Sequence, residues 1–512
     1  MSTYAPENLH ATTAPLIGGV NGAVERYFSA RSLLAIVFML MNFTLAARQI
    51  IDPDFWWHLR TGQYLVETRS VPHTDVFSAL FFGKEWIAHE WLSEVTIYGL
   101  YRLGGFAALI ISFALLITAA FALVYRRCNV RENHVYLAGG VVLLAAMATA
   151  PTWGVRPQMF SFLFAALFLM VLEKYQRERS NRSIWWLVPL MVLWVNMHAG
   201  FAAGIVLIAI SIVGMVLDSV VYREVSFAAC RKRLAPLLTV LLACLAAPLL
   251  NPSGFRIYTY PFETLTSQAM MKFIEEWRTP DFHKLMFQPL ALFILALLGG
   301  LALSHKRISF VQLLMLVGTT WAMLRSGRNV PFFVLVATPL IVARWWDWIS
   351  SHRRNQRSAV ERTTGIKVAL NILLLIVIPV VLVVVRVQRT VAAQTEVEAQ
   401  HFPGAAVEYI RSHHLPQPLF NEYHWGGYVI WKLYPDYRVF IDGRADVYGD
   451  AYFEEFMSTH AGEPHWRESL AKHNVRTALI TPDCALASLL REDHAWQKVF
   501  EDEQAVIFVR SE

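Results

Sequence analysis

Long apolar runs recur along the whole chain, and they limit the possible folds more than any other feature. A helix needs roughly 20 apolar residues to cross the hydrocarbon layer of a bilayer, within a range of about 17–25. The sequence therefore predicts a polytopic α-helical membrane protein with about eleven transmembrane helices. The candidate spans are 33–50, 106–124, 135–152, 158–172, 184–198, 202–221, 235–250, 287–304, 308–324, 331–348 and 367–386.

Composition supports this class and excludes two others. Hydrophobic residues make up 55% of the 512 and charged residues only 16%, against about 25% charged in an average soluble domain. A chain so poor in charge cannot cover the surface of a large soluble protein. The aromatic content of 13% is too high for a disordered chain. The cysteines have no close spacing, which predicts neither a zinc site nor a disulfide framework.

Basic residues set the expected orientation, because Lys and Arg concentrate in cytoplasmic connections. The N-terminal segment 1–32 is expected on the cytoplasmic side, and an odd number of spans places the C-terminus outside. We expect the bacterial inner membrane, with the tail periplasmic or extracellular. Topology explains the net charge of +6, so no nucleic-acid partner is expected. The basic connections are 126–131, 174–182, 223–233, 306–307 and 353–362.

The polar segments on the outer side define the expected domains. A transmembrane domain over 33–386 carries outer loops at 51–94 and 251–286, and a tail over 387–512 follows it. The tail is charged and alternates short apolar runs, which is typical of a small extracytoplasmic α/β domain. Its expected elements are helices over 404–414, 451–459 and 466–473, and strands at Arg438–Ile441, Arg476–Ile480 and Ala505–Val509.

The first outer loop holds the strongest chemical signal. Asp52 and Asp54 lie two residues apart at the outer end of a span, and His58, His89 and Glu90 follow. Paired carboxylates can share a divalent cation, or one of them can act as a base because a low dielectric raises its pKa. The alternative is structural: Asp52 caps a helix that begins near Asp54, and the neighbouring Trp pair belongs to an interfacial aromatic belt.

Other polar residues fall at the same outer ends. His198 lies in a tight turn between spans five and six, and Glu276 lies in the loop 251–286. Arg325 and Arg328 bracket the turn between spans nine and ten. Convergence of these ends would place acids and arginines around one site, where the arginine fork suits a phosphate. The alternative for each arginine is snorkelling to lipid headgroups.

The tail contains a dense polar and aromatic patch. It includes Trp425, Tyr428, Asp442 and Arg444, with a Gly-Gly pair at 426–427. Glycine allows a close backbone approach or a left-handed turn, and Asp442 follows an expected strand, where loops build sites. A strand–turn–helix unit packed on the membrane domain would explain the same residues. Both interpretations stay open.

Missing motifs narrow the function further. The chain has no Gly-x-x-x-x-Gly-Lys loop, no His-Glu-x-x-His run and no Gly-x-Ser-x-Gly elbow. ATP-driven transport is therefore disfavoured. Ionisable residues inside the spans are scarce, whereas a proton-coupled transporter usually needs some near the midplane.

The arrangement resembles the GT-C membrane glycosyltransferases, which use polyprenyl-phosphate-linked sugars. The resemblance is strongest over 30–175 and rests on the first loop at 52–75 and on the entry to the second span at 91–105. A fainter likeness links 425–428 and Asp442 to the region of the WWDYG motif in the oligosaccharyltransferase catalytic subunit, with Gly-Gly in place of the central Asp-Tyr. Protein mannosyltransferases and aminoarabinose transferases belong to the same group.

The resemblance implies an enzyme that moves a sugar from a polyprenyl-phosphate donor to a glycan, lipid or protein acceptor on the outer face of the bilayer. Asp52 matches the loop-one aspartate of the family, the implied base or metal ligand, and Asp54 is its neighbour. The implied cofactor is a divalent cation, Mg or Mn, held by these two residues. Implied contacts to substrate or lipid phosphate are His58, His89, Glu90, His198, Glu276, Arg325 and Arg328, and implied acceptor contacts are Trp425, Tyr428, Asp442 and Arg444.

One departure from the family keeps an alternative open. The outer turn 152–156 holds no acid, whereas oligosaccharyltransferase has a second acidic motif there. The alternative is a non-catalytic GT-C scaffold that acts in lipid-linked glycan or polysaccharide assembly. For the transferase, a single displacement by an acceptor hydroxyl would invert the anomeric carbon and needs no carboxylate nucleophile.

Overall fold

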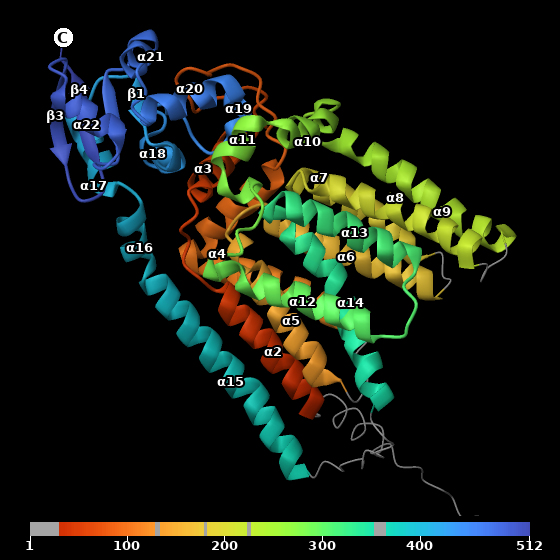
Figure 1. The fold of residues 1–512 in the computed structure, drawn as a ribbon. Helices are drawn as coiled ribbons and strands as arrows, with labels where there is room; N and C mark the ends of the chain where they lie inside the picture. The colour runs from red at the N-terminus through yellow and green to blue at the C-terminus, as the bar shows by residue number, and fades with distance from the viewer. Residues whose placement is uncertain (1–29, 129–133, 179–181, 223–226, 353–364, 512) are drawn as a thin grey trace, which may run out of the picture.

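Long helices form a bundle, and a domain of short helices and strands covers one end of it (Figure 1). The computed structural model describes residues 30–128, 134–178, 182–222, 227–352 and 365–511. The helices up to the tail are α2 (Ala30–Ala46), α3 (Asp54–Thr68), α4 (Trp91–Arg127), α5 (Val135–Thr149), α6 (Gln158–Glu178), α7 (Leu187–Met197), α8 (Phe201–Leu217), α9 (Phe227–Ala246), α10 (Arg256–Thr266), α11 (Gln268–Phe273), α12 (Gln288–Leu303), α13 (Phe310–Arg325), α14 (Val330–His352) and α15 (Gly365–Ala392).

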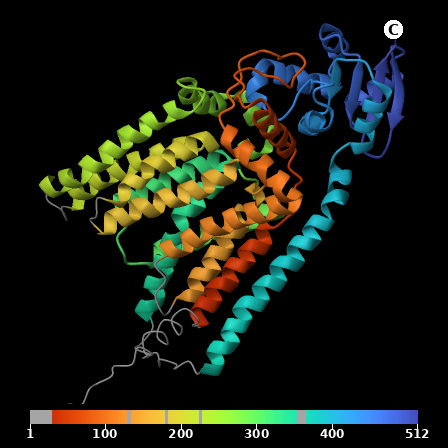
Figure 2. The same ribbon diagram turned by 180° about the vertical axis from the view of Figure 1, so that it is seen from behind.

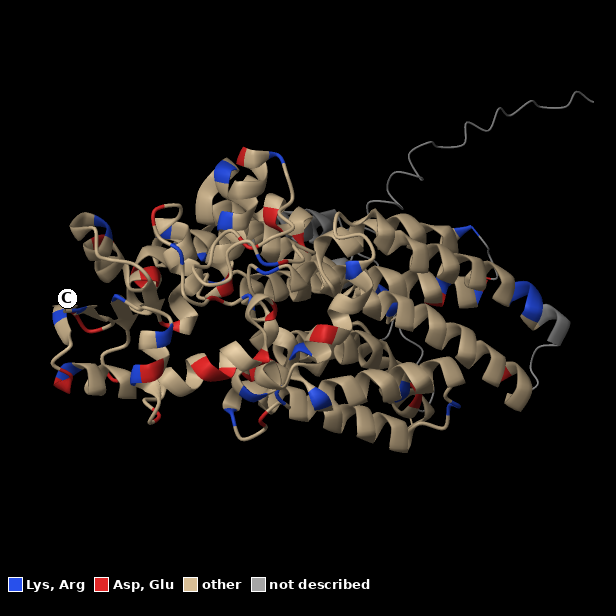
Figure 3. Cartoon of the chain, turned by 90° about the horizontal axis from the view of Figure 1, so that it is seen from above, with Lys and Arg blue, Asp and Glu red and all other residues tan. Residues whose placement is uncertain are grey.

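The bundle is built from apolar helices. Over the described residues, seven helices are long and apolar enough to cross a membrane, judged by length and composition. The shorter apolar helices are Leu33–Ala46, Ser183–Met197 and Phe310–Arg325. Figure 3 shows few charged residues along the bundle helices and many at the end that carries the tail. The chain is thus an integral membrane protein. Each predicted span coincides with a helix, while the count of eleven spans stays a prediction.

Several helix boundaries differ from the prediction. The helix α2 ends at Ala46, so a short non-helical segment separates it from Asp52. The element α4 spans Trp91–Arg127, but non-helical backbone at Gly104 and Gly105 divides it at a kink into two helical parts. The second part begins at 106, where the predicted span begins, and the first part belongs to the outer loop. The first outer loop thus begins with the helix α3 and ends in the start of α4, with a non-helical stretch over 69–90 between them.

The last long helix packs against the first. The helix α15 runs along the outside of the bundle beside α2 and leads into the tail (Figures 1 and 2). Arg386 Nε donates to the carbonyls of Thr44 and Ala47 at 3.2 and 2.9 Å. The Gln394 side chain exchanges two hydrogen bonds of 2.9 Å with the backbone of Ile50. These contacts satisfy carbonyls that the end of α2 leaves unpaired, and they fix the segment that precedes Asp52.

The tail forms a small α/β unit. Its sheet has the order β1-β2-β4-β3, with β1 parallel to β2 and the other pairs antiparallel. Its elements are α16 (Gln394–His401), α17 (Gly404–His413), β1 (Leu419–Asn421), α18 (Gly426–Leu433), α19 (Ala445–Tyr448), α20 (Asp450–His460), α21 (Trp466–Lys472), β2 (Thr477–Ile480), α22 (Ala485–Glu492), β3 (Trp496–Glu501) and β4 (Val506–Arg510).

Most of the tail prediction is confirmed, and one strand is wrong. The three predicted helices are α17, α20 and α21, and two of the predicted strands are β2 and β4. The segment Arg438–Ile441 is not a strand, because Val439 makes only isolated bridges to Ser78 and Leu419. The Asn421 side chain accepts from Phe440 N–H and donates to Ile441 O, both at 2.8 Å. A side chain thus occupies the backbone groups that a strand ladder would use.

A continuous apolar core joins the tail to the bundle. Trp56 of α3 is buried, and its ring centroid lies 5.5 Å from that of Phe402 and 5.0 Å from that of Tyr428. The same buried cluster extends through the bundle helices. A second buried cluster lies under the sheet and includes Phe420, Phe453 and Phe508. The tail is therefore held in a fixed position over α3.

Candidate active site

Arg156 lies between three carboxylates that come from distant parts of the chain. Its Nε is 2.9 Å from Asp52 Oδ2, its Nη2 is 2.6 Å from Asp54 Oδ2, and its Nη1 is 2.8 Å from Glu276 Oε2. All three guanidinium nitrogens are thus engaged. We call Asp52, Asp54, Arg156 and Glu276 the Asp52 cluster.

Helix ends bring these four side chains together. Asp52 ends the segment after α2, Asp54 is the first residue of α3, and Arg156 lies just before α6. Glu276 lies in a 3-10 turn at 275–277, inside the outer loop 251–286. Asp52 Oδ1 also accepts the backbone N–H of Asp54 at 3.0 Å. The helix-start interpretation of Asp52 is therefore confirmed, and it holds together with a place in a charged cluster.

The cluster lies deep in the fold but remains accessible. Its side chains keep between 17 and 30% of their exposure. Burial raises the pKa of Asp54 to about 7, even though Arg156 opposes the shift. Burial also raises the pKa of Asp52, again against Arg156. Burial works the same way on Glu276, but Arg156 and Arg328 outweigh it and hold the pKa of this carboxyl below its usual range. A carboxyl that exchanges its proton near neutral pH, as Asp54 does, suits acid–base chemistry.

The Asp52–Asp54 pair does not fit a divalent cation in this arrangement. Asp52 Oδ1 accepts a backbone N–H and its Oδ2 faces Arg156. Asp54 Oδ1 accepts Trp57 Nε1–H at 3.3 Å and its Oδ2 accepts from Arg156. All four oxygens therefore already face donors within the protein. A cation here would have to displace a guanidinium.

The two predicted phosphate-binding arginines differ in their surroundings. Arg328 Nη2 lies 3.9 Å from Glu276 Oε1, and the guanidinium stacks 4.4 Å above the Trp277 ring. Arg325 is exposed, and its guanidinium lies 5.8 Å from the centroid of the Trp321 ring. Arg328 thus borders the Asp52 cluster, whereas Arg325 is exposed beside Trp321.

A second buried group contains Glu90, the third carboxylate that was predicted as a site residue in the first loop. His58 Nδ1 lies 3.6 Å from Glu90 Oε1 and 3.4 Å from Glu94 Oε1, while His89 Nε2 lies 3.4 Å from Glu90 Oε2. Burial lowers the pKa of His58 to about 3, so its imidazole is neutral near pH 7. The structure thus brings together three predicted residues, His58, His89 and Glu90, and adds Glu94.

His198 stands beside this group rather than in it. Its Nδ1 accepts Gly200 N–H at 3.0 Å and lies 2.8 Å from Ser161 Oγ. Its ring centroid is 6.4 Å from that of His89. Burial lowers the pKa of His198 to about 3. The tight turn predicted here is confirmed, since α7 ends at Met197 and α8 begins at Phe201.

The four predicted acceptor residues are all buried in the packing of the tail. Arg444 pairs with Asp442 and with Asp75 of the first loop, each at 2.7 Å, and the side chains are at most 1% exposed. Trp425 Nε1 donates to a backbone carbonyl at 3.3 Å, and Tyr428 OH donates to a Glu398 oxygen at 2.9 Å. In this conformation these residues hold the tail against the first loop, and an acceptor-binding role for them stays a prediction.

Gly426 and Gly427 allow a close backbone approach and do not form a left-handed turn. Both lie at the start of α18, and neither has a positive φ. A Cβ on Gly427 would lie 2.7 Å from the carbonyl oxygen of Pro53. The pair lets α18 cross directly over the first turn of α3.

Two important residues, Arg156 and Glu94, are absent from the predicted site residues. The sequence placed Arg156 between spans three and four, at the same outer ends as the acids, but gave it no role. Glu94 lies four residues after Glu90, a spacing that puts both carboxylates on one side of a helix. That spacing, taken together with the nearby His58, is the sequence signal for the group of His58, Glu90 and Glu94.

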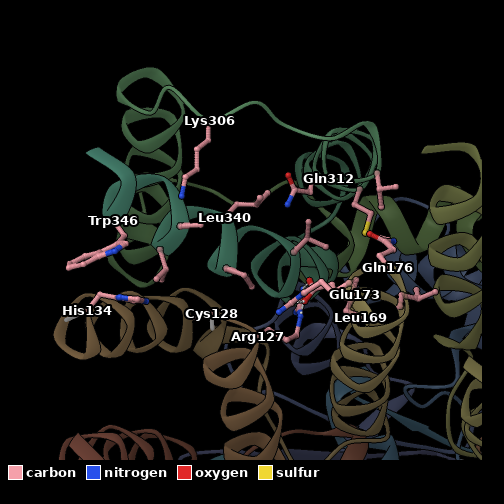
Figure 4. A pocket seen from close by; sticks show the side chains of 18 residues that line it. Arg127, Cys128, His134, Leu169, Glu173, Gln176, Lys306, Gln312, Leu340 and Trp346 are labelled. Atoms are coloured by element: carbon pink, nitrogen blue, oxygen red, sulfur yellow. Dashed lines mark hydrogen bonds and ion pairs between the residues drawn. The ribbon is translucent and has the colours of Figure 1, made fainter. Parts of the chain in front are cut away.

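A separate cavity lies at the other end of the bundle. It has a volume of about 720 Å³ and is lined by residues near the C-terminal ends of α4 and α6 and the N-terminal end of α13 (Figure 4). Arg127 Nη2 pairs there with Glu173 Oε1 at 2.6 Å, and its Nη1 donates to Leu335 O at 2.7 Å. No predicted site residue lines this cavity.

Comparisons with known proteins identify the fold. No protein-family model matches the chain, and no curated protein matches it in sequence. The apo structure of ArnT from Cupriavidus metallidurans matches with a TM-score of 0.50 and 14% identity, covering 96% of this chain and 98% of that one. ArnT from the same organism bound to undecaprenyl phosphate matches with a TM-score of 0.48 and 13% identity, covering 95% and 98%. The fold is therefore similar to that of ArnT, in agreement with the predicted fold class.

Proposed function

We propose that this protein is a membrane glycosyltransferase that moves a sugar from a polyprenyl-phosphate donor to an acceptor hydroxyl. The observation that carries the proposal is the Asp52 cluster, in which two carboxyls with raised pKa values, Asp52 and Asp54, face one guanidinium at one end of an apolar bundle. The GT-C fold supports it, because the matched solved structure is a transferase. The acceptor is a glycan, a lipid or a protein.

The proposed chemistry is one displacement. Asp52 or Asp54 takes the proton from the acceptor hydroxyl, and the oxygen forms a bond to the anomeric carbon. The bond from that carbon to the phosphate oxygen breaks, and polyprenyl phosphate leaves with the electron pair. We assign the base to Asp52, with Asp54 fixing the shared Arg156. The configuration is inverted because only one displacement occurs.

Cationic groups must stabilise the leaving phosphate. Arg328 is the better-placed of the two predicted arginines, because it borders the cluster while keeping 26% side-chain exposure. Arg325 lies on the exposed side of the same turn, where an approaching lipid phosphate would meet it first. The other polar residues near the site, His198 and Glu276, would contact the sugar.

The expected location follows the charge pattern of the connections. We place 33–386 in the bacterial inner membrane, the segment 1–32 in the cytoplasm and the tail 387–512 on the outer side. The polar end of the bundle with the Asp52 cluster would then face the periplasm or the exterior. A lipid-linked donor would enter from the outer leaflet.

One observation favours the second candidate, a non-catalytic scaffold. Every carboxylate of the Asp52 cluster is already ion-paired with Arg156. An arrangement of this kind also serves to lock helix ends together. In that case the protein would hold a lipid-linked glycan or a partner of an assembly pathway without chemistry.

Mass spectrometry of lipids that co-purify with the detergent-solubilised protein distinguishes the transferase from the non-catalytic scaffold. Wild type is compared with Asp52→Asn, with Asp54→Asn, and with Asp436→Asn as a control at an exposed aspartate. The transferase predicts that polyprenyl-phosphate sugars accumulate on Asp52→Asn, while wild type and Asp436→Asn carry the sugar-free phosphate. Identical lipids on all four proteins would support the scaffold. Absence of polyprenyl lipids from all of them would remove the donor assignment.

A further inference from the structure

A buried group of one imidazole and two carboxylates links α3 to the start of α4. His58 Nδ1 lies 3.4 Å from Glu94 Oε1 and 3.6 Å from Glu90 Oε1. One ligand atom from each residue can be chosen so that all three lie within 4.8 Å of one another. The α3 backbone passes so close to α4 at Gly62 that a Cβ there would overlap the carbonyl of Glu94. The side chains therefore meet because the two helices are in tight contact.

The group is not satisfied by the protein atoms around it. The single proton that His58 Nδ1 can carry cannot serve two carboxylates, and both distances exceed the usual range of about 2.7–3.2 Å. Glu94 Oε2 has no hydrogen-bond partner, although the side chain is only 1% exposed. Buried polar atoms are normally paired, since leaving one unpaired is costly. The geometry thus leaves one buried oxygen of Glu94 without a partner, beside an imidazole and a second carboxyl group.

We infer that His58, Glu90 and Glu94 form a binding site for one zinc ion. With metal–ligand bonds of about 2.0–2.2 Å, ligand atoms around a tetrahedral zinc lie roughly 3.3 Å apart. The two distances from His58 Nδ1 are close to this value, and the carboxylates close the remaining gap by small side-chain rotations. An imidazole ligand favours zinc over magnesium or calcium. His89 faces the second oxygen of Glu90 at 3.4 Å and orients that ligand.

This site is distinct from a cation at the Asp52–Asp54 pair. The oxygens of that pair all face donors, whereas Glu94 keeps an oxygen free. An ion at His58 would join α3 to α4 one helical turn away from Asp54. Its role is to hold the first turn of α3 in place. The inference goes beyond the proposed transferase and does not depend on it.

The test measures bound metal, not activity. The full-length protein in detergent is stripped with a chelator, incubated with zinc chloride, desalted and analysed by inductively coupled plasma mass spectrometry. Parallel samples receive magnesium chloride. The variants are Glu94→Gln and Glu90→Gln, which keep the side-chain shape, and Asp52→Asn. Glu85→Gln is the control, because Glu85 is an exposed residue that pairs with Arg256 at the surface.

We expect roughly one zinc per chain in wild type, Glu85→Gln and Asp52→Asn, and no magnesium. Glu94→Gln and Glu90→Gln should lose most of the zinc while eluting as wild type does in size exclusion. Zinc should also raise the thermal unfolding midpoint of wild type but not of Glu94→Gln, which covers the case of a poorly folded variant. Equal zinc in wild type and both Glu variants, or none in wild type, would overturn the inference. Loss of zinc in Asp52→Asn alone would also overturn the inference, because it would assign the cation to the Asp52–Asp54 pair.

Discussion

At the residue scale, one guanidinium faces all three carboxylates of the Asp52 cluster. Arg156 contacts Asp52, Asp54 and Glu276, and Arg328 lies 3.9 Å from Glu276. Each carboxylate alone would be costly at this depth, so the guanidinium decides how far the pair at 52 and 54 is ionised. Both the protonation and the stability of the cluster should therefore depend on Arg156.

Replacing Arg156 with glutamine should destabilise the protein most at alkaline pH. Breaking a fully buried ion pair costs about 3–5 kcal/mol, and we expect about 1–3 kcal/mol here because the groups retain exposure. The cost should shrink toward pH 6, as the carboxyls take up protons. Thermal unfolding in detergent at pH 6 and 8 measures this, with Arg325→Gln as an exposed control. A pH-independent loss would contradict the charge argument.

Asp54 should make the fold less stable as the pH rises. The carboxyl has a pKa of about 7 in the fold and 3.8 as a free group. Between these values the unfolded chain has lost the proton that the folded chain still holds, so stability falls with rising pH and levels off above about 7. Asp54→Asn removes this dependence.

The difference in stability between Asp54→Asn and wild type should thus grow from pH 4 to pH 7, by no more than about 4 kcal/mol at about 1.4 kcal/mol per pKa unit. Unfolding midpoints at four pH values check it, and Asp436→Asn should show no such trend. A difference that shrinks with rising pH would show that the pKa of Asp54 is lowered instead.

At the element scale, the loop between Phe440 and α19 presses against the start of α3. A Cβ on Gly443 would overlap Asp54 Oδ1 and lie 3.1 Å from Trp57 Nε1. Glycine at this position therefore lets the tail pack against the first outer loop without displacing the Asp54 carboxylate.

Gly443→Ala should push Asp54 out of place. Overpacking costs about 1–3 kcal/mol, and an error of about 1 Å in a reacting group lowers the rate by roughly 100-fold. We expect a 10- to 100-fold slower transfer, about one to two powers of ten, measured once the donor is known. Gly99→Ala is the matched control, because a Cβ there meets nothing within 4 Å. An unchanged rate in Gly443→Ala would mean that Asp54 need not stay where it is.

Sequence periodicity located the elements well and the contacts poorly. The long helices were predictable because each carries an apolar run. The strand β1 has only three residues, and β3 is polar and half-exposed, so neither gives a clear alternating pattern. Asp52, Asp54 and Glu276 were named as candidates, but their meeting at Arg156 depends on how segments from distant parts of the chain converge. No local pattern encodes that convergence.

At the scale of the whole molecule, a buried ion pair joins the tail to the first outer loop. Arg444 bridges Asp442 of the tail and Asp75 of the loop, with Tyr448 OH donating to Asp442 at 2.5 Å. These side chains are almost fully buried. The two ion pairs of Arg444 therefore hold the tail against the loop, and removing one partner would leave buried charges unpaired at a high cost.

Arg444→Met should loosen the tail. Two buried carboxylates would lose their partner, at a cost of about 3–5 kcal/mol. We expect limited proteolysis to release fragments of 387–512 much faster than in wild type, while the bundle fragment persists. Arg411→Met is the control, because its exposed pair with Glu408 contributes at most about 1 kcal/mol. Equal cleavage rates in both variants would exclude a holding role for the buried pair.

The pairing of α15 with α2 has a consequence for how the protein is made. Arg386 and Gln394 bind the backbone at 44–50, directly before Asp52. A ribosome delivers these residues more than 300 positions after the segment that they fix. The hydrogen bonds that fix the segment before Asp52 can therefore form only after these later residues have been made and α15 lies beside α2.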